Sequence, residues 1–203
     1  MSRLELLVEE PSMEEALRHL LPKIIGNRAE WKVINMRSKG RLMKELPDRL
    51  RGYKRRMDGG EEIKVIVLID RDNDDCHALK RQLEDMARNA GLQTKTAAGT
   101  GGAAFQVVNR IAIEELEAWF MGDTAALQRA FTSLGGVRFP NSFNNPDNGG
   151  TWERLHHFLK QNGIYRNSFP KIDAARNIAK HMEPERNRSR SFQCFLQGVV
   201  ACL

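Results

Sequence analysis

A short apolar run that ends in acidic residues constrains the fold of this chain most strongly. The segment from Val65 to Ile69 holds five consecutive apolar side chains and is followed at once by Asp70. Such a run is typical of a strand that is covered on both faces, as in a parallel sheet between helix layers. Ligands of these sheets bind beyond the carboxyl ends of the strands. The segment therefore predicts an α/β fold with a binding site at one edge of its sheet.

The acidic residues after this run are of the type that binds hard metal ions. Asp70 and Asp72 form an Asp-x-Asp pair at the predicted strand end. Carboxylate oxygens are the ligands that Mg²⁺ and Mn²⁺ prefer in proteins, so the pair is a candidate metal site. A second interpretation is open at this point: the loop is solvated, and Asp74 or Asp75 caps the helix that follows.

The N-terminal segment also predicts a strand that ends in carboxylates. Apolar residues alternate from Leu4 to Val8, and Glu9 and Glu10 follow. A Ser-x-x-Glu sequence at Ser12 is typical of a capping box, so we expect a helix to begin there. Glu10 could simply favour the positive end of that helix dipole. Glu9 closes the strand and is the better candidate for a site residue.

Strands and helices alternate over the first two thirds of the chain, which indicates an α/β core. The expected strands cover residues 3–9, 31–36, 64–70, 94–98 and 105–113. The expected helices cover residues 12–25, 40–52, 76–90 and 114–121, then 124–131, 151–161, 173–182 and 191–202. We expect a core over residues 1–122 and a helical extension over 123–203 packed on it, together forming one structural domain.

A third group of acids follows a further apolar segment. Glu114 and Glu117 lie three residues apart and would share one face of the helix expected over 114–121. Glu115 would then be exposed to solvent. The aromatic residues, including Trp119 and Trp152, fall mainly at positions that indicate the core.

Positive charge is concentrated in one segment of the chain. The net charge is +6, and nine basic residues against two acidic ones lie between Arg37 and Arg56. A basic segment beside an acidic metal site suits a polyanion whose backbone is held by cations, which favours nucleic acid as the partner. A solvated basic helix is the alternative. The residues expected to contact nucleic acid are Arg37, Lys39, Arg41, Lys54, Arg55 and Arg56.

The sequence favours a cytoplasmic protein without a membrane partner. No apolar run approaches the ~20 residues of a membrane span, and the N-terminus lacks the apolar core of a signal peptide. Cys76, Cys194 and Cys202 are far apart and lack the close pairs of a zinc or redox motif, so we expect reduced thiols.

These motifs resemble the TOPRIM domain, the metal-binding α/β module of topoisomerases, bacterial primases and OLD nucleases. VEEPSME (8–14) is similar to the family's first motif, and IDRD (69–72) to its Asp-x-Asp motif. An uncharacterised bacterial TOPRIM-like family, often described beside AAA-type ATPases, is similar over more of the chain. The similar segments are LVEEPSMEEAL, VLIDRDNDDC, IAIEELEAWF, KIDAARNIAKHM and RSRSFQCF.

The resemblance implies a mostly parallel sheet flanked by helices, an AAA-type ATPase partner and a set of site residues. Glu9, Asp70 and Asp72 match the catalytic and metal-binding acids. Glu117 matches a further acid of the family, which implies a fourth metal ligand at this position. Additional candidates are Glu10, Asp74 and Glu114 for the metal, and Lys171 and Arg190 for the leaving phosphate. Glu10 replaces the usual Gly of the family.

The function expected from these features is hydrolysis of phosphodiester bonds in nucleic acid, with Mg²⁺ or Mn²⁺ as cofactor. No Tyr stands in a topoisomerase-like context. Two other classes stay open: a nucleic-acid or partner-binding module with a vestigial metal site, and a different Mg²⁺-dependent phosphoryl enzyme. In phosphatases of the haloacid-dehalogenase type, Asp-x-Asp follows the first strand, whereas here it follows a later one.

Overall fold

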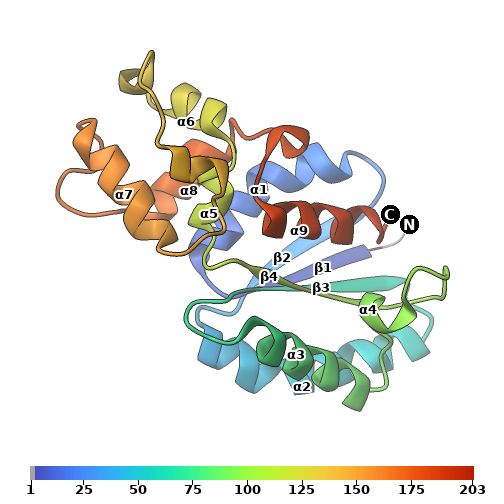
Figure 1. Ribbon diagram of the computed structural model, residues 1–203. Coiled ribbons are helices and arrows are strands. Elements are labelled where there is room, and N and C mark those ends of the chain that lie inside the picture. The colour runs from blue at the N-terminus through green and yellow to red at the C-terminus, as the bar shows by residue number, and fades with distance from the viewer. Residues whose placement is uncertain (1–2) are drawn as a thin grey trace.

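Four parallel strands form a single sheet in the computed structural model, which describes residues 3–203 (Figure 1). The strands lie in the order β2-β1-β3-β4. Their bounds are Arg3–Val8 (β1), Glu30–Asn35 (β2), Ile63–Asp70 (β3) and Val107–Ala112 (β4). All neighbouring pairs are parallel. The α/β class expected from the apolar run is confirmed.

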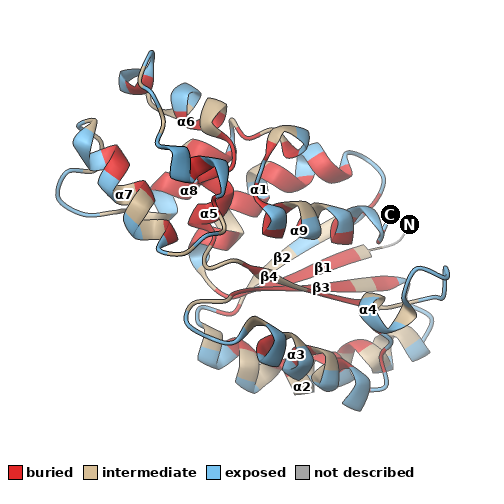
Figure 2. Cartoon of the chain, viewed as in Figure 1, coloured by how far each residue is buried: buried red, intermediate tan, exposed pale blue. Residues whose placement is uncertain are grey.

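Helices cover both faces of the sheet. Helices α2 (Lys39–Asp58) and α3 (Cys76–Asn89) lie on one face, and α1 (Pro11–Ile25) and α9 (Arg190–Val200) lie on the other (Figure 1). The short helix α4 (Lys95–Ala98) precedes β4. The interior separates into two hydrophobic clusters, one on each face of the sheet. Most residues of the inner strands are buried (Figure 2).

The central strand β3 explains this two-layered core. Its side chains alternate between the faces, as in any strand. Ile66 and Leu68 belong to the cluster beneath α1 and α9, whereas Val65, Val67 and Ile69 belong to the cluster beneath α2 and α3. All five are 0% exposed. An apolar run without polar alternation is therefore what this central position requires.

A helical lobe follows β4 and lies near the carboxyl ends of the strands (Figure 1). It contains α5 (Glu117–Met121), α6 (Thr124–Ala130), η1 (Thr132–Leu134), η2 (Asn141–Asn144), α7 (Thr151–Gln161), α8 (Lys171–Ala179) and η3 (Pro184–Arg186). Helix α8 packs on α1, so the lobe is attached to the helix layer of the core.

The last helix returns from the lobe to the sheet and packs on β4. Gly198 allows its close approach, because a Cβ atom there would lie 2.8 Å from Arg110 Nε and 2.9 Å from Val108 Cγ1. Arg110 Nε also donates a hydrogen bond to the carbonyl of Cys194 over 2.7 Å. The C-terminal extension expected from the sequence thus includes a helix that covers the sheet itself.

The expected strand over residues 94–98 is wrong, because this segment forms α4. Thr94 caps the helix by accepting a hydrogen bond from the backbone N–H of Ala97 at 3.1 Å. This local bond competes with a strand ladder. Only an isolated bridge joins Thr94 to Val107 in the described chain. The interpretation that Asp74 or Asp75 caps the helix after the acidic loop is confirmed for Asp75. Its side chain accepts a hydrogen bond from Ala78 N at the start of α3 over 2.7 Å.

The capping box expected at Ser12 is also wrong. Helix α1 begins at Pro11, and Glu10 is its N-cap residue. Proline suits this first position because its fixed φ fits a helix and its missing N–H would have no helical partner there. The Ser12 hydroxyl donates to the carboxylate of Glu10.

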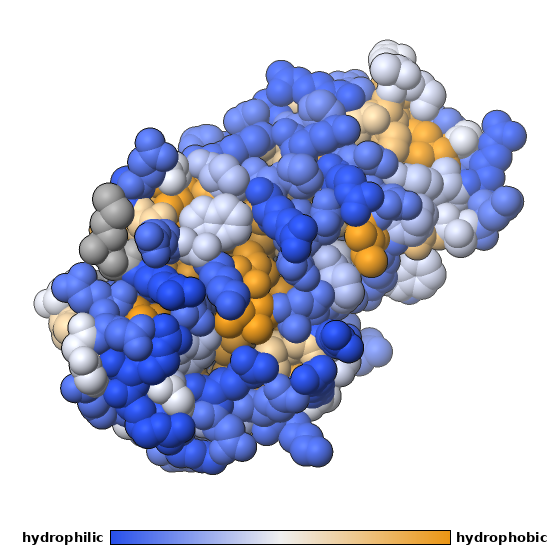
Figure 3. Space-filling view, turned by 180° about the vertical axis from the view of Figure 1, so that it is seen from behind, coloured by the Kyte–Doolittle hydropathy of each residue, from blue (hydrophilic) through white to orange (hydrophobic). Residues whose placement is uncertain are grey.

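The surface is largely hydrophilic, with hydrophobic patches in the middle and towards one end of the face shown in Figure 3. Large hydrophobic side chains with high exposure include Ile172, Val200 and Leu203. Within residues 3–203, no helix combines the length and apolar character needed to cross a bilayer.

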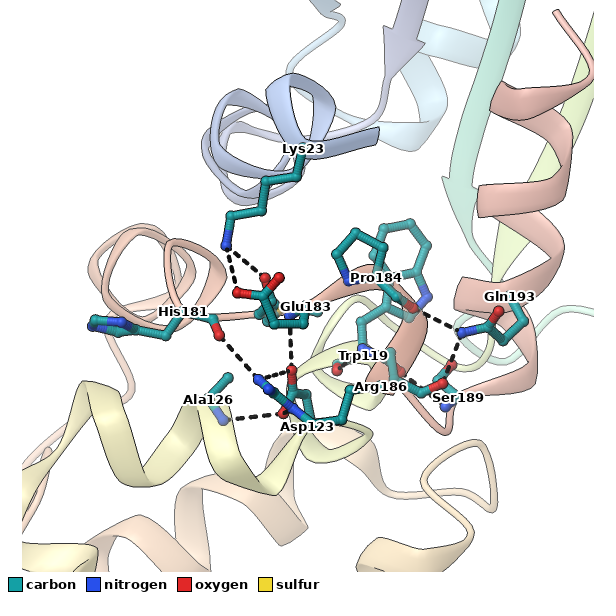
Figure 4. Close-up of polar contacts among 12 residues, drawn as sticks. Lys23, Trp119, Asp123, Ala126, His181, Glu183, Pro184, Arg186, Ser189 and Gln193 are labelled. Atoms are coloured by element: carbon teal, nitrogen blue, oxygen red, sulfur yellow. Dashed lines mark hydrogen bonds and ion pairs between the residues drawn. The ribbon is translucent and has the colours of Figure 1, made fainter. Parts of the chain in front are cut away.

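A buried aspartate joins several segments of the lobe (Figure 4). Asp123 caps α6 by accepting a hydrogen bond from Ala126 N over 3.1 Å. Its two oxygens also accept from Arg186 Nε and Nη2, at 2.7 and 2.9 Å, and from Glu183 N at 2.9 Å. Lys23 of α1 donates to the nearby carbonyl of Met182 over 2.6 Å. One carboxylate therefore joins α6 to the segment of η3, and Lys23 bonds the residues before η3 to α1.

We expect Asp123→Ala to lower the free energy of unfolding by about 2–4 kcal/mol, because it removes a helix cap and leaves Arg186 without its partner. Urea unfolding followed by circular dichroism measures this loss. The matched control is Asp173→Ala, since the Asp173 side chain on α8 is 60% exposed. It should change stability by less than about 0.5 kcal/mol. Equal effects of both substitutions would contradict the assigned role of Asp123.

Candidate functional site

The carboxylates that follow β1 and β3 meet at the carboxyl edge of the sheet. Glu9 follows β1 directly, and Asp70 is the last residue of β3. The backbone N–H of Asp70 donates to Glu9 Oε2 over 3.1 Å. Because the two strands are parallel neighbours, their ends lie at the same edge. The structure thus brings together the two acidic strand ends that the sequence singled out.

Two further glutamates complete a carboxylate cluster, defined here as Glu9, Glu10, Asp70 and Glu117. Glu117 begins α5, and its side chain is 0% exposed, while Asp70 is 2% exposed. The negative charges of Glu117, Glu10 and Glu9 all act on Asp70. Acids from β3, from the β1–α1 turn and from α5 are therefore held close together.

The most buried members of this cluster have unsatisfied oxygens. Asp70 Oδ1 and both carboxylate oxygens of Glu117 have no hydrogen-bond partner among the described residues. Burial, followed by the neighbouring negative charges, raises the pKa of Asp70 well above its usual value. Burial likewise raises the pKa of Glu117 from 4.5 to about 7. A buried carboxylate without a partner is unfavourable unless it takes up a proton or a cation.

Glu9 is similarly perturbed. Burial raises its pKa from 4.5 to about 7, although the hydrogen bond from Asp70 N–H lowers it and Asp72 raises it further. Only Oε2 of Glu9 accepts this bond, so Oε1 is available to another donor. A carboxylate with a pKa near neutrality suits proton transfer at physiological pH.

Lys39 of α2 binds the acidic loop after β3. Its Nζ lies 2.9 Å from Asp72 Oδ2 and 2.6 Å from Asp74 Oδ2, and it donates to the carbonyls of Asp70 and Arg71. Although burial lowers the pKa of Lys39, its hydrogen bonds to the two aspartates raise it above the usual value overall. Asp72 adopts a left-handed backbone with a φ of 50°. Lys39 thus fixes the loop that carries Asp72, and its contact with nucleic acid stays a prediction.

The expectation that Glu114 and Glu117 share a helix face is wrong, because α5 begins only at Glu117. Glu114 lies in the preceding bend, where its Oε1 is 2.5 Å from Arg71 Nη2. Its Oε2 accepts a hydrogen bond from Gly150 N over 2.5 Å. Glu114 therefore fixes the loop before α7 through its own partners.

Glu115 is partly buried, which contradicts the expected solvent position. Its Oε2 accepts from Thr151 Oγ1 over 3.2 Å, and its Oε1 lies 3.5 Å from Lys171 Nζ. Lys171 faces the cluster as well: burial lowers its pKa, but the charges of Glu117, Glu10 and Glu115 raise it above the usual value overall. Lys171 is thus an ammonium group beside the carboxylate cluster.

Arg190 differs from Lys171 in its placement. Its side chain is exposed, and its backbone N–H donates to Asp147 Oδ2 over 2.6 Å. Within residues 3–203, Arg190 makes no ion pair with a site carboxylate. Spacing in the sequence does not distinguish Lys171 from Arg190 as a partner of the phosphate. In the structure, Lys171 lies beside the cluster, and Arg190 is exposed.

Several basic side chains of α2 are paired within the chain. Their ion pairs are Arg41 with Glu45, Lys54 with Asp58, and Arg56 with both Glu5 and Glu61. Arg37 and Arg55 are exposed. Arg55 and Arg56 also line an open hollow of about 560 Å³ beside Tyr53. This part of α2 remains a predicted contact surface for nucleic acid.

Two acids of the carboxylate cluster, Asp70 and Glu117, have the buried, unpaired oxygens that suit a divalent cation. As the side chains stand, no three His, Cys, Asp or Glu residues in the described chain are grouped tightly enough to hold one. Lys39 and Arg71 already bind Asp72 and Glu114. The unpaired oxygens belong to Asp70 and Glu117, so these are the atoms that a cation would satisfy.

The partners of the cations in this site are not evident from sequence position. Arg71 stands between the two aspartates of the motif, and Lys39 lies in the basic segment, but neither position indicated an internal contact. Lys171 was a candidate for the leaving phosphate, without any sign of its proximity to Glu115. Only the tertiary arrangement of α2, α5 and α8 defines these partners.

We expect the metal-free protein to lose stability as the pH rises from about 4.5 to about 7. Glu117 has a higher pKa in the folded state, so folding takes up protons in this window. Its ionisation costs on the order of 3 kcal/mol. Glu117→Gln should therefore raise the free energy of unfolding at pH 8 by roughly 1–3 kcal/mol, with little change near pH 4.5.

Urea titrations of the metal-free protein at the two pH values test this expectation. Glu30→Gln is the control, because Glu30 on β2 is exposed. It should leave the pH dependence unchanged. If Glu117→Gln lowered the free energy of unfolding at pH 8, the ionised Glu117 side chain would not destabilise the fold.

One family matches this chain. The family model of DUF4276, a domain of unknown function, matches residues 8–199. No curated protein and no solved structure shows significant similarity to the chain. The matched region contains the whole carboxylate cluster and nearly all of α9, and it spans most of the sequence. The chain therefore belongs to the DUF4276 family.

Proposed function

We propose that this protein is a TOPRIM-like, Mg²⁺- or Mn²⁺-dependent phosphodiesterase that acts on nucleic acid. The observation that carries the proposal is the pair of buried acids, Asp70 and Glu117, whose oxygens lack partners at the carboxyl edge of a parallel sheet. This edge is where parallel sheets bind ligands. The resemblance of VEEPSME and IDRD to TOPRIM motifs supports the same activity.

A divalent cation would offset the repulsion within the cluster. Asp70 and Glu117 would hold it through their unpaired oxygens. Glu9 would join them after its side chain turned toward the ion, and Asp72 could join if it exchanged its contact with Lys39. When bound, the ion would supply activation of water and neutralisation of charge on the phosphate. Because the cation binds ionised carboxylates, metal affinity should increase as the pH rises through 7.

The chain's own residues would divide the remaining tasks. Glu9 Oε1 can accept the proton of an attacking water, since Oε2 is occupied by Asp70 N–H. Lys171 lies on the lobe side of the cluster and can balance charge on a phosphate. Lys39 and Arg71 fix the loops that carry Asp72 and Glu114.

We expect the purified protein to convert supercoiled plasmid to relaxed or linear product with Mg²⁺ or Mn²⁺. Asp70→Asn and Glu9→Gln should each reduce the rate by a factor of at least about 100, because the first removes a carboxylate ligand of the cation and the second removes the proton acceptor for the attacking water. Agarose gels measure the product. Glu30→Gln is the control and should retain activity. Absence of metal-dependent product from both the plasmid and a single-stranded oligonucleotide would contradict the proposed hydrolysis.

Thermal unfolding provides a readout that does not depend on activity. Mn²⁺ should raise the melting temperature of the wild-type protein, because an ion that binds only the folded state stabilises it. Asp70→Asn should abolish most of this increase. An equal increase in both proteins would place the cation elsewhere.

A second candidate function is a non-catalytic module that binds nucleic acid or a partner through a vestigial metal site. The pairing of Asp72, Asp74 and Glu114 with internal cations favours it, since these acids are already neutralised. A protein of this kind would bind nucleic acid equally well with and without Asp70→Asn and would yield no product.

The proposal includes an AAA-type ATPase as partner and the cytoplasm as location. The ATPase rests on the family resemblance alone, and co-purification from cells that express both proteins would test it. The cytoplasmic location is supported by the cysteines, because Cys76, Cys194 and Cys202 are all free of disulfides.

A further inference from the structure

Three aromatic rings form a cluster on the helical lobe. Trp152 and His156 of α7 stack with an interplanar angle of 20° and ring centroids 6.2 Å apart. Phe169 lies 5.6 Å from His156 on a different segment. His156 Nε2 is 3.0 Å from the carbonyl of Tyr165, which holds the imidazole in place. We call these three rings, Trp152, His156 and Phe169, the aromatic platform.

The platform is partly open to solvent. The expectation that Trp152 belongs to the core is wrong, because it is only partly buried and lies in neither hydrophobic cluster. Leu155, Phe158 and Leu159 form the buried face of helix α7. Trp152 and His156, four residues apart, stand along the margin of that face. Position in the helix, rather than residue type, leaves these rings accessible.

The two segments that carry the aromatic platform are both linked to Glu115, which is close in sequence to Glu117 of the carboxylate cluster. Thr151, the neighbour of Trp152, donates a hydrogen bond to Glu115 Oε2 over 3.2 Å. Lys171, two residues after Phe169, lies 3.5 Å from the other oxygen of Glu115. Both segments that carry the rings are thus attached at Glu115. Lys171 in turn faces Glu117 and Glu10 of the cluster.

The charge of this part of the chain suits a polyanion. Between residues 151 and 171 there are four basic residues and one acid, Glu153. The basic residues are Arg154, Lys160, Arg166 and Lys171. Arg154 donates to the carbonyls of Ser142 and Pro146, whereas Lys171 lies at Glu115 beside the segment that carries Phe169. Proteins that bind single strands combine aromatic rings, on which bases stack, with cations that contact the backbone.

We propose that the aromatic platform stacks an unpaired base of single-stranded nucleic acid whose neighbouring phosphate lies at the carboxylate cluster. This inference rests on the proposed function and specifies its substrate class. Bases inside a duplex are already stacked and cannot reach the rings without being unpaired. Single strands should therefore bind better than duplexes, with little dependence on sequence.

Binding to fluorescent oligonucleotides tests the inference in the Asp70→Asn background, where cleavage is blocked. The probes are a short oligothymidylate, its duplex, and a strand of equal length that carries abasic sites. Trp152→Ala should weaken binding of the oligothymidylate by roughly ten- to a hundredfold, as expected for the loss of one stacked base. It should change binding of the abasic strand by less than about twofold.

Two further variants control for folding and location. Trp152→Phe keeps an aromatic face and should restore most of the affinity, with the melting temperature of its parent. Trp31→Ala removes a partly buried tryptophan from the edge strand β2 and should leave binding unchanged. If Trp152→Ala weakens the abasic strand as much as the oligothymidylate, or neither of them, the platform does not bind bases.

These outcomes are separable from those of the proposed hydrolysis. Asp70-dependent cleavage of plasmid together with unchanged oligothymidylate binding in Trp152→Ala would overturn the platform and leave the phosphodiesterase intact. Base-dependent binding without any metal-dependent cleavage would overturn the phosphodiesterase and leave the aromatic platform intact. This outcome would support the non-catalytic module. Preference of the parent protein for duplex would also overturn the platform.

Discussion

The hydrogen bond from Asp70 N–H to Glu9 Oε2 joins the two strand ends on which the site depends. It places a carboxylate against a strand end that already carries a buried aspartate, so repulsion and desolvation act on both acids. The fold tolerates this because β3 is buried on both faces and fixes the position of Asp70. Glu117 adds a third buried acid from α5. The site is therefore imposed by the sheet and does not depend on a flexible loop.

Cations from three different elements surround this acidic centre. Lys39 comes from α2, Arg71 from the loop after β3, and Lys171 from α8. Each pairs with an outer acid of the site, whereas the inner oxygens of Asp70 and Glu117 stay unpaired. Asp72, Glu114 and Glu115 are thus engaged in ion pairs that join elements of the fold, whereas Asp70 and Glu117 keep unpaired oxygens that a ligand could contact. This difference is what favours a binding site over a set of surface ion pairs.

Sequence patterns were sufficient where neighbouring residues determine the outcome. The continuous apolar run from Val65 to Ile69 predicted the buried strand β3. Because β1 and β3 pair in parallel, Glu9 and Asp70 are neighbours. The same reasoning failed at residues 94–98, where the Thr94 side chain satisfies a helix N-terminus. It also failed for Glu114 and Trp152, whose surroundings are set by Arg71, by the loop at Gly150 and by the edge of the lobe. Contacts between distant segments leave no periodic trace in the sequence.

The position of α9 bears on the order in which the molecule can assemble. Arg110 on β4 bonds to a carbonyl that lies 84 residues later in the chain. Until α9 has packed on β4, Val108 and the apolar side chains beside it lack this cover. Docking of this late segment thus completes the hydrophobic cluster on one face of the sheet.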